Sequence, residues 1–334
     1  MSDERPTERP NADGPLRIGL VLGAGGVVGG AFHAGVLAAI EHATGWDPRR
    51  AAVVVGTSAG SISGSMLRAG VSASDLFARV QGRSLSPEGQ RLLASAGPPI
   101  APQMTGPARR MRAPSDIAGT LLRAAARPFA ARPVALFAGL LPEGTIGTDE
   151  IEHGVAAVTN SIWPALPLYI CAVRARDGRL VVFGRDALAA LPLAVAASCA
   201  IPGFFRPVEI DGDSYIDGGV HSPTNVDVLR DEPLDLVVVS SPMSIRGSGL
   251  RSVVDQPVRR WARTLLDLEL VRLRRRKIPT LALQPALDDL DAFGRNAMDT
   301  DRRSGAATQA FRSTLAFLTR ADVESRLRLL QAAS

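Results

Sequence analysis

The chain has 334 residues, of which 46% are hydrophobic, 21% are charged and only 4% are aromatic. This length is enough for a sizeable core, and the composition excludes a disordered, collagen-like or disulfide-framework protein. The 38 basic and 33 acidic residues leave a formal charge of only +5, which does not indicate a nucleic-acid partner. Cys171 and Cys199 lie in apolar surroundings and are interpreted as small buried hydrophobes, not as a metal site.

Residues 1–15 are polar and contain prolines and charges of both signs. They lack the basic-then-apolar order of a signal peptide, so we expect a disordered tail on a cytoplasmic protein. No stretch reaches about 18 uncharged apolar residues, the length that a transmembrane helix needs. Any contact with a membrane is therefore expected to be peripheral.

From residue 17 onward, short apolar runs alternate with helical patterns. Residues 17–22 and 51–55 are the first two apolar runs, and small residues with helical spacing follow each, at 31–42 and 59–67. This alternation predicts a parallel sheet with helices on its faces. Further candidates for buried strands lie at 168–172, 180–183 and 234–239.

The alternation breaks down between residues 81 and 142, and we interpret residues about 82–145 as a helical or irregular cap over the sheet, with a weak helix at 116–126. Residues 83–142 contain eight arginines against two acidic residues, more positive excess than the whole chain carries. Arginines interleaved with apolar residues are typical of a surface that binds anionic lipid headgroups. A solvated loop region is the alternative.

Two segments near the C-terminus are read as helical. The spacing over 304–330 predicts one amphipathic helix within residues 304–334, and the basic cluster at 272–277 is interpreted as an exposed helix end. Neither this cluster nor the cap has the aromatic interleaving that is typical of single-stranded nucleic-acid binding.

A candidate nucleophile lies directly between a predicted strand and a predicted helix. Gly56-Thr57-Ser58-Ala59-Gly60 fits the pattern G-x-S-x-G. A serine at such a turn is held in a strained backbone conformation, with its hydroxyl exposed at the carboxyl end of the sheet. The next helix directs the positive end of its dipole at the site. Ser58 is therefore the predicted nucleophile, and a merely structural tight turn is the alternative.

A glycine-rich loop, residues 23–30, connects the first strand to the first helix. Such a loop can cradle a dinucleotide phosphate or supply backbone N–H groups to an oxyanion hole. Its spacing departs from the strict G-x-G-x-x-G, and no acidic residue ends the second strand, where a ribose hydroxyl would bind. The oxyanion hole is therefore favoured over a nucleotide-binding oxidoreductase. Gly35, in the first helix, is attributed to close helix–sheet packing.

A serine nucleophile needs a base, and the chain has only four histidines. His33 and His42 are expected on the surface of the first helix, and His153 is expected in solvent. His221 would serve a Ser–His–Asp esterase, which stays open as an alternative.

An aspartate is the preferred base, because a desolvated carboxylate can accept the serine proton directly. Asp217 ends a predicted short strand and precedes Gly218 and Gly219. Asp-Gly is also the commonest turn signal, so these residues alone leave a hairpin turn open. Asp211-Gly212-Asp213 is assigned to such a hairpin.

Three motifs in this order, in a chain poor in histidine, resemble the patatin-like phospholipase family. They are Gly25-Gly26-Val27-Val28-Gly29-Gly30, Gly56-Thr57-Ser58-Ala59-Gly60 and Asp217-Gly218-Gly219. Residues 197–205 also resemble the family's stretch before the aspartate. The likeness runs from about residue 16 to 239 and is weakest across the cap.

The resemblance implies a three-layer α/β/α sandwich with a mainly parallel central sheet over residues 16–303, acting as a lipid acyl hydrolase on carboxylic esters. Ser58 would attack the ester carbonyl, and Asp217 would accept its proton. The N–H groups of Gly25, Gly26 and Val27 would form the oxyanion hole, with motif glycines at Gly56, Gly60, Gly218 and Gly219. No metal or organic cofactor is implied, and the expected partners are a lipid or ester substrate and an anionic membrane surface.

Two positions depart from the family pattern. Val27 stands where the family has a glycine and narrows the pocket, and Gly29 stands where the family has a basic residue. A catalytically weak lipid-binding protein is therefore a further alternative.

Overall fold

The computed structural model describes residues 14–97, 144–246 and 257–334. Its strands are β1 (Ile18–Leu22), β2 (Val53–Thr57), β3 (Leu168–Arg174), β4 (Arg179–Phe183), β5 (Val208–Ile210), β6 (Asp213–Asp217), β7 (Leu236–Ser240) and β8 (Thr280–Leu283). Its α-helices are α1 (Gly26–Thr44), α2 (Ala59–Arg68), α3 (Ala73–Val80), α4 (Pro87–Leu93), α7 (Asp149–Thr159), α8 (Leu191–Ser198), α10 (Pro257–Arg275), α11 (Leu290–Phe293), α12 (Arg303–Leu318) and α13 (Glu324–Ala332). Short 3-10 turns include η2 (Gly218–Val220) and η3 (Val226–Leu229).

Within these ranges eight strands form one mainly parallel sheet. Strands β3, β2, β1, β7 and β8 follow one another in parallel. The pairings of β4, β5 and β6 are antiparallel and lie beyond β2 at one end of the sheet. The predicted apolar runs therefore do form strands, most of them parallel.

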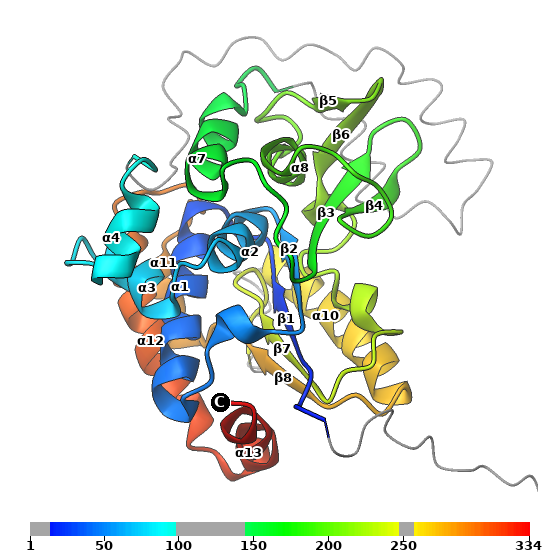
Figure 1. Ribbon diagram of the computed structural model, residues 1–334. Coiled ribbons are helices and arrows are strands. Elements are labelled where there is room, and N and C mark those ends of the chain that lie inside the picture. The colour runs from blue at the N-terminus through cyan, green and yellow to red at the C-terminus, as the bar shows by residue number, and fades with distance from the viewer. Residues whose placement is uncertain (1–13, 98–143, 247–256) are drawn as a thin grey trace, which may run out of the picture.

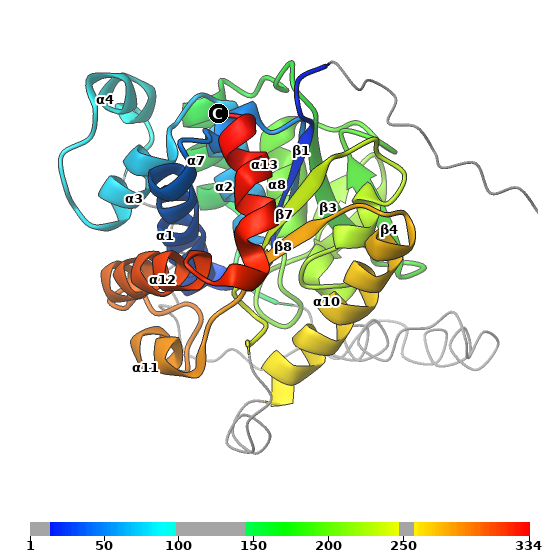
Figure 2. The same ribbon diagram turned by 90° about the horizontal axis from the view of Figure 1, so that it is seen from below.

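Helices cover both faces of this sheet, because side chains alternate between the faces along each buried strand. Leu20 and Leu22 of β1 join the core beneath α1, α8 and α12. Val21, between them, joins a second core that includes Leu266 and Leu273 of α10. Figures 1 and 2 show α1 and α12 on one side of the sheet and α10 on the other. The predicted three-layer α/β/α architecture is confirmed.

The C-terminal segment differs from its prediction, since it forms two helices instead of one. The backbone of Arg320 is extended between α12 and α13, and this turn brings Leu330 into the core beside α1. Gly35 is also reassigned, because its close neighbour is a helix and not the sheet. A Cβ at Gly35 would collide with the carbonyl of Ala307 and approach the Cβ of Ala310 in α12 to 2.9 Å.

Two smaller predictions, the buried cysteines and the exposed basic cluster, are confirmed. Cys171 and Cys199 are buried and not disulfide-bonded. The basic cluster at 272–277 lies at the exposed end of α10, apart from the buried Leu273. In the ranges given above, no helix has the length and apolarity to cross a bilayer.

Two of the predicted segments lie largely outside the described residues. These are the N-terminal tail, of which residues 14 and 15 are described, and the cap, including the expected helix at 116–126 and most of its arginines. Of the cap, residues 82–97 and 144–145 are described. The first of these ranges contains α4.

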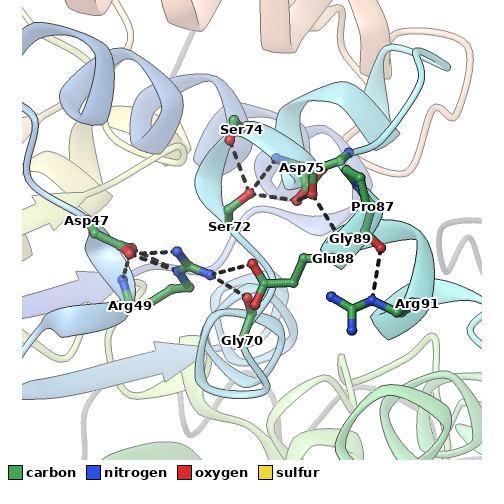
Figure 3. A network of polar contacts seen from close by, with 11 residues as sticks. Asp47, Arg49, Gly70, Ser72, Ser74, Asp75, Pro87, Glu88, Gly89 and Arg91 are labelled. Carbon is green, nitrogen blue, oxygen red and sulfur yellow. Dashed lines mark hydrogen bonds and ion pairs between the residues drawn. The ribbon is translucent and has the colours of Figure 1, made fainter.

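A buried carboxylate ties α4 to α3. Asp75 accepts hydrogen bonds from the backbone N–H of Ser86 (2.7 Å), the hydroxyl of Ser86 (2.7 Å) and the hydroxyl of Ser72 (2.8 Å). Beside it, Arg49 donates to the carbonyl of Gly70 at 2.8 Å and lies 3.6 Å from Glu88 (Figure 3). These contacts fix the orientation of α3, which forms one wall of the site.

Candidate active site

The pairing register along β3 brings the two motif strands end to end. Strand β4 occupies one edge of β3 over residues 170–174, so β2 and β6 share the other edge, one after the other. Thr57, the last residue of β2, lies opposite Cys171, and Asp217, the last residue of β6, lies opposite Ala172. Ser58 and Asp217 therefore meet at adjacent positions, although 158 residues separate them in the sequence.

Ser58 has the strained conformation that its motif predicts. Its backbone angles are φ 53° and ψ −122°, between β2 and the first residue of α2. The two flanking glycines make this turn possible, because a Cβ at Gly60 would collide with the carbonyl of Leu22 and a Cβ at Gly56 would lie 2.5 Å from the Cα of Ser61. A left-handed conformation at a residue other than glycine is costly and clusters at functional sites.

Asp217 does not belong to a hairpin turn. The hairpin lies at Asp211 and Gly212, whose φ angles of 50° and 81° connect β5 to β6 as predicted. After Asp217 the chain enters η2, and the Asp217 carboxylate accepts the N–H of Gly219 at 2.7 Å. Its own N–H donates to the carbonyl of Ala200 at 2.9 Å.

Burial shifts the proton affinity of Asp217. Its side chain is 5% exposed, and desolvation raises its pKa from 3.8 to about 6, although hydrogen bonding by the Ser58 hydroxyl and the Gly219 N–H opposes the shift. The Ser58 hydroxyl therefore lies close enough to the Asp217 carboxylate to influence its pKa by hydrogen bonding. Bonds between a nucleophile and its base commonly tighten only when substrate binds. Ser58 and Asp217 thus lie close together, and burial makes the Asp217 carboxylate more basic than an exposed one.

Three hydrogen bonds hold the glycine-rich loop beside Ser58. The N–H groups of Gly23 and Ala24 donate to Ser240 and Pro223, and the N–H of Val28 donates to Ala297 at 2.9 Å. Between them, the N–H groups of Gly25, Gly26 and Val27 have no acceptor in the described ranges. Such unpaired donors at a helix N-terminus suit a developing oxyanion.

The three predicted oxyanion donors are not equivalent. Gly26 and Val27 line the same cavity as Ser58, whereas Gly25 is buried behind them. Ala59, which sequence reasoning missed as a donor, also lines the cavity, and its N–H has no acceptor among the residues described. The signal for Ala59 was its place directly after the nucleophile.

His33 corrects one prediction, because it is fully buried instead of lying on the helix surface. Its Nε2 lies 2.8 Å from the carbonyl of Gly23 and its Nδ1 lies 2.8 Å from the hydroxyl of Ser240. Desolvation lowers the pKa of His33 to about 4, so the ring is neutral at pH 7. Nε2 therefore donates to Gly23, and His33 supports the glycine-rich loop from below.

Two buried polar side chains that sequence reasoning did not single out connect the motifs. Ser198 accepts the N–H of Ser58 at 2.9 Å and donates to the carbonyl of Cys171 at 2.7 Å. Asn225 donates to Thr57 Oγ1 at 3.1 Å and to the carbonyl of Gly218 at 3.3 Å. Ser198 therefore ties Ser58 to β3, and Asn225 bridges β2 and the residue after Asp217. Ser198 lies within the stretch 197–205 that resembles the family, whereas no local pattern marks Asn225.

Glu269 of α10 anchors the loop that holds Asn225. The carboxylate is 2% exposed, and its Oε2 accepts the hydroxyl of Thr224 at 2.7 Å and the N–H of Val226 at 3.1 Å. Among the residues that the structure describes, its Oε1 has no hydrogen-bond partner. Desolvation and the nearby Asp227 raise its pKa from 4.5 to about 7.

The other histidines lie elsewhere. His221 does not line the cavity, and its Nδ1 pairs with Asn225 Oδ1 at 2.9 Å. His42 and His153 are exposed, as predicted. Within the described ranges, no group of three His, Cys, Asp or Glu side chains is arranged to hold a metal ion.

Ser58 opens onto an apolar cavity of about 130 Å³ between α1, α2, α3 and α7. Its walls are mainly aliphatic and aromatic, and include Ala34, Ile62, Met66, Leu76, Ile151 and Phe205. Apolar pockets with a few convergent polar groups are typical of sites for small molecules and acyl chains. The sequence motifs predicted the nucleophile but not this cavity, whose walls come from distant segments.

Comparison with known proteins gives similar solved structures and a family. Similar solved structures include VipD from Legionella pneumophila, with a TM-score of 0.45 and 14% identity, covering 91% of this chain and 66% of that chain. Another is the type III effector protein ExoU, with a TM-score of 0.36 and 19% identity, covering 94% of this chain and 54% of that chain. The chain thus spans less than two thirds of either protein. The model of the family described as patatin-like phospholipase matches residues 20–230, more than half of the chain, so the protein belongs to that family.

Proposed function

We propose that this protein is a lipid acyl hydrolase that cleaves carboxylic esters through Ser58 and Asp217. The observation that carries the proposal is the strained Ser58, placed beside a desolvated aspartate at the floor of an apolar cavity. Membership of the patatin-like phospholipase family supports the same substrate class.

In the first half of the reaction, Ser58 Oγ attacks the ester carbonyl while its proton passes to the Asp217 carboxylate. A pKa of about 6 keeps Asp217 ionised at pH 7 yet basic enough to accept that proton. Negative charge develops on the carbonyl oxygen, and the N–H groups of Gly26, Val27 and Ala59, which line the cavity and have no acceptor among the described residues, would stabilise it. Asp217 then gives the proton to the leaving alcohol, and an acyl-serine remains.

In the second half, water replaces the alcohol. Asp217 takes a proton from the attacking water, the tetrahedral intermediate forms again at the same donors, and the proton returns to Ser58 Oγ as the C–O bond breaks. One carboxylate therefore serves as base and then as acid in each half, and the reaction needs no histidine. The products are a fatty acid and an alcohol.

A fluorophosphonate probe tests the nucleophile directly, because it labels an activated serine covalently. We expect the wild-type protein to be labelled and Ser58→Ala to be unlabelled. Ser65→Ala is the matched control, since Ser65 lies in α2, the helix that follows Ser58, is buried and does not line the cavity. Release of fatty acid from a phospholipid and from a simple ester, measured on the same proteins, distinguishes a hydrolase from a lipid-binding protein that only keeps the fold.

Asp217→Asn and His221→Ala separate the two candidate bases. Loss of turnover in Asp217→Asn with turnover retained in His221→Ala supports the Ser58–Asp217 pair. The opposite pattern would assign the reaction to a Ser–His–Asp esterase. A wild-type protein that takes up no probe and releases no fatty acid would contradict the proposal altogether.

A further inference from the structure

One buried loop, residues 222–226, contacts the chain beside both the candidate nucleophile and the candidate base. Asn225 in this loop donates from Nδ2 to Thr57 Oγ1 at 3.1 Å and to the carbonyl of Gly218 at 3.3 Å. Thr57 directly precedes the nucleophile, and Gly218 directly follows the base. We call residues 222–226 the anchor loop. A displacement of this loop would therefore move the two reacting groups relative to each other.

The anchor loop also contacts the glycine-rich loop that carries the oxyanion donors. The carbonyl of Pro223 accepts the N–H of Ala24 at 2.7 Å, and Ala24 directly precedes Gly25. The two loops lie close together, because a Cβ at Gly23 would lie 2.9 Å from the same Pro223 carbonyl. All three segments that the proposed reaction uses thus meet one loop.

The shape of the anchor loop depends on contacts with other segments. Residues 222–225 form neither helix nor strand, although residues 222–226 are all buried. Buried backbone outside regular structure needs hydrogen-bond partners from elsewhere. Asn225 also has left-handed backbone angles, φ 53° and ψ 36°, a conformation that is uncommon outside glycine and persists where the surrounding structure imposes it.

Glu269 of α10 supplies such contacts on both sides of Asn225. Its Oε2 accepts the hydroxyl of Thr224 at 2.7 Å and the N–H of Val226 at 3.1 Å. One buried carboxylate oxygen therefore holds the residue before Asn225 and the residue after it.

Glu269 lies on the far side of the sheet from the cavity. Its helix covers the sheet face opposite α1 (Figures 1 and 2), and Leu266 and Leu273, about one turn to either side, pack in the core on that face. Glu269 is not among the residues that line the cavity, and it lies beyond residues 20–230, which the family model matches. A route from Glu269 to the reacting groups runs through the anchor loop.

We propose that Glu269 is a positioning residue, which fixes the anchor loop and through it the spacing of Ser58, Asp217 and the oxyanion donors. This inference rests on the proposed function, because the spacing matters only if these groups react together. A misplacement of about 1 Å can lower the rate of a reaction about 10²-fold. Substrate binding should change little, since the cavity lies on the other face of the sheet, between α1, α2, α3 and α7.

Steady-state kinetics on a soluble ester test this role. Glu269→Met keeps the length of the side chain and removes the acceptor, so kcat should fall about 10²-fold while KM stays within about twofold. Glu269→Gln should restore most of that loss, because its amide oxygen can accept the same two hydrogen bonds. Thr224→Val removes one of the two bonds with little change in shape, and it should lower kcat by about tenfold.

A fluorophosphonate probe distinguishes positioning from simple damage to the fold. Labelling carried to completion counts the serines that can still react, so kcat can be expressed per labelled site. A merely structural defect lowers the number of sites and leaves kcat per site unchanged, whereas misplacement lowers kcat per site. Asp267→Ala is the matched control, since Asp267 lies in the same helix and pairs with Arg263 at 2.8 Å, and it should keep the wild-type kcat.

A double-mutant cycle tests the route through the loop. Asn225→Gly removes the amide while glycine adopts the left-handed backbone freely, and it should lower kcat per site about 10²-fold. Because both residues act through the same contacts, combining Asn225→Gly with Glu269→Met should lower kcat by less than the product of the two single effects. Losses that multiply would show that Glu269 acts independently of the anchor loop and would overturn the proposal.

The remaining outcomes separate this proposal from the proposed function. An unchanged kcat per site in both Glu269→Met and Thr224→Val, a change confined to KM, or a Glu269→Gln variant as slow as Glu269→Met would each overturn the positioning role and leave the hydrolase intact. If Glu269→Met does not fold, Thr224→Val and Asn225→Gly decide the question. A wild-type protein that takes up no probe and hydrolyses no ester would overturn both proposals.

Discussion

Ser58 separates two regions of opposite character. Below it, buried polar groups make hydrogen bonds of 2.7 to 3.3 Å that join β2, β3, α8 and η2 through Ser198, Asn225 and Asp217. Above it, the described walls of the cavity are mainly apolar, and the polar side chains among them are Ser63, Arg79 and Arg303. We call the hydrogen-bonded groups below Ser58 the floor of the site, and the apolar cavity walls above it the roof.

The difference matters because the two kinds of contact respond differently to change. A buried hydrogen bond is directional, and leaving one partner unsatisfied costs about 1–3 kcal/mol. An apolar wall is not directional, and its side chains can be exchanged for others of similar volume at a cost usually below about 1.5 kcal/mol. We therefore expect changes in the floor to alter the rate of the chemistry and changes in the roof to alter the choice of substrate.

The largest effect is expected at Asp217. Asp217→Asn keeps an oxygen that can accept the Gly219 N–H, so the fold should persist, but the amide cannot accept the serine proton. Turnover of a soluble ester should fall by about 10³-fold, within the usual range for loss of a general base. Asp213→Asn is the control, because Asp213 lies in the same strand and pairs with Arg174 and Arg176 away from the cavity. Comparable losses in both variants would mean that the strand, not the base, was damaged.

A smaller loss is expected at Ser198, which touches no substrate. Ser198→Ala removes the acceptor for the Ser58 N–H and the donor to the Cys171 carbonyl. A slightly misplaced nucleophile can cost about 10²-fold in rate, so kcat should fall by that order with little change in KM. Steady-state kinetics on a soluble ester measure both constants. A change confined to KM would indicate that Ser198 shapes the cavity instead of positioning Ser58.

The floor should also give the enzyme its pH dependence. The active form of Asp217 is ionised and its pKa is about 6, so log kcat/KM should rise with unit slope below pH 6 and level off above it. At pH 5 the rate should therefore be about tenfold below the plateau. The residual activity of Asp217→Asn should lack this step. A wild-type profile that is flat between pH 4.5 and about 7.5 would show that Asp217 is not the titrating base.

Sequence patterns predicted the parts of this molecule that depend on local chemistry. The glycines around Ser58, the Asp-Gly-Gly turn and the buried strands can each be identified from a pattern of a few neighbouring residues. Ser198 lies in the family-like stretch 197–205, but its hydrogen bonds join residues that are distant in the sequence. Asn225 is not marked by any local pattern, because an isolated buried asparagine looks like any loop residue until the fold brings its partners close. The β3 register that aligns Ser58 with Asp217 is likewise a long-range property.

The wrong predictions have the same origin. His33 is buried because it lies against the sheet, where its ring contacts the Gly23 carbonyl and the hydroxyl of Ser240 in β7. Gly35 instead lies against Ala307 and Ala310 of α12. Both β7 and α12 follow α1 by about 200 to 270 residues, so no local pattern predicts either contact.

Substitutions in the roof should change the preference for acyl-chain length more than the overall rate. Ala34 of α1 is 3% exposed and lines the cavity, so Ala34→Phe should shorten the space open to an acyl chain. The ratio of kcat/KM for an octanoyl ester to that for a butyryl ester should fall by about tenfold, because each methylene in an apolar pocket contributes roughly 1–3 kcal/mol. Ile62→Ala, on the opposite helix, should shift the ratio the other way. Equal losses of kcat/KM on both esters would indicate that the substitution disturbs the floor instead of the space for the acyl chain.

The smallest effect is thermodynamic and concerns Glu269, at the base of the floor. Its pKa in the folded protein is raised from 4.5 to about 7, so ionisation opposes folding. The stability that its protonated form contributes is complete below pH 4.5 and is lost as the pH rises through 7. Between pH 5 and 8 this carboxyl group should lower the free energy of unfolding by about 2 kcal/mol. Glu269→Gln should remove that loss while Asp217, whose raised pKa acts in the same direction at lower pH, still contributes its own. Urea unfolding of both proteins at pH 5 and pH 8 measures the difference. An identical pH dependence in the two proteins would mean that Glu269 is ionised at little cost, and that the buried floor is better solvated than its hydrogen bonds indicate.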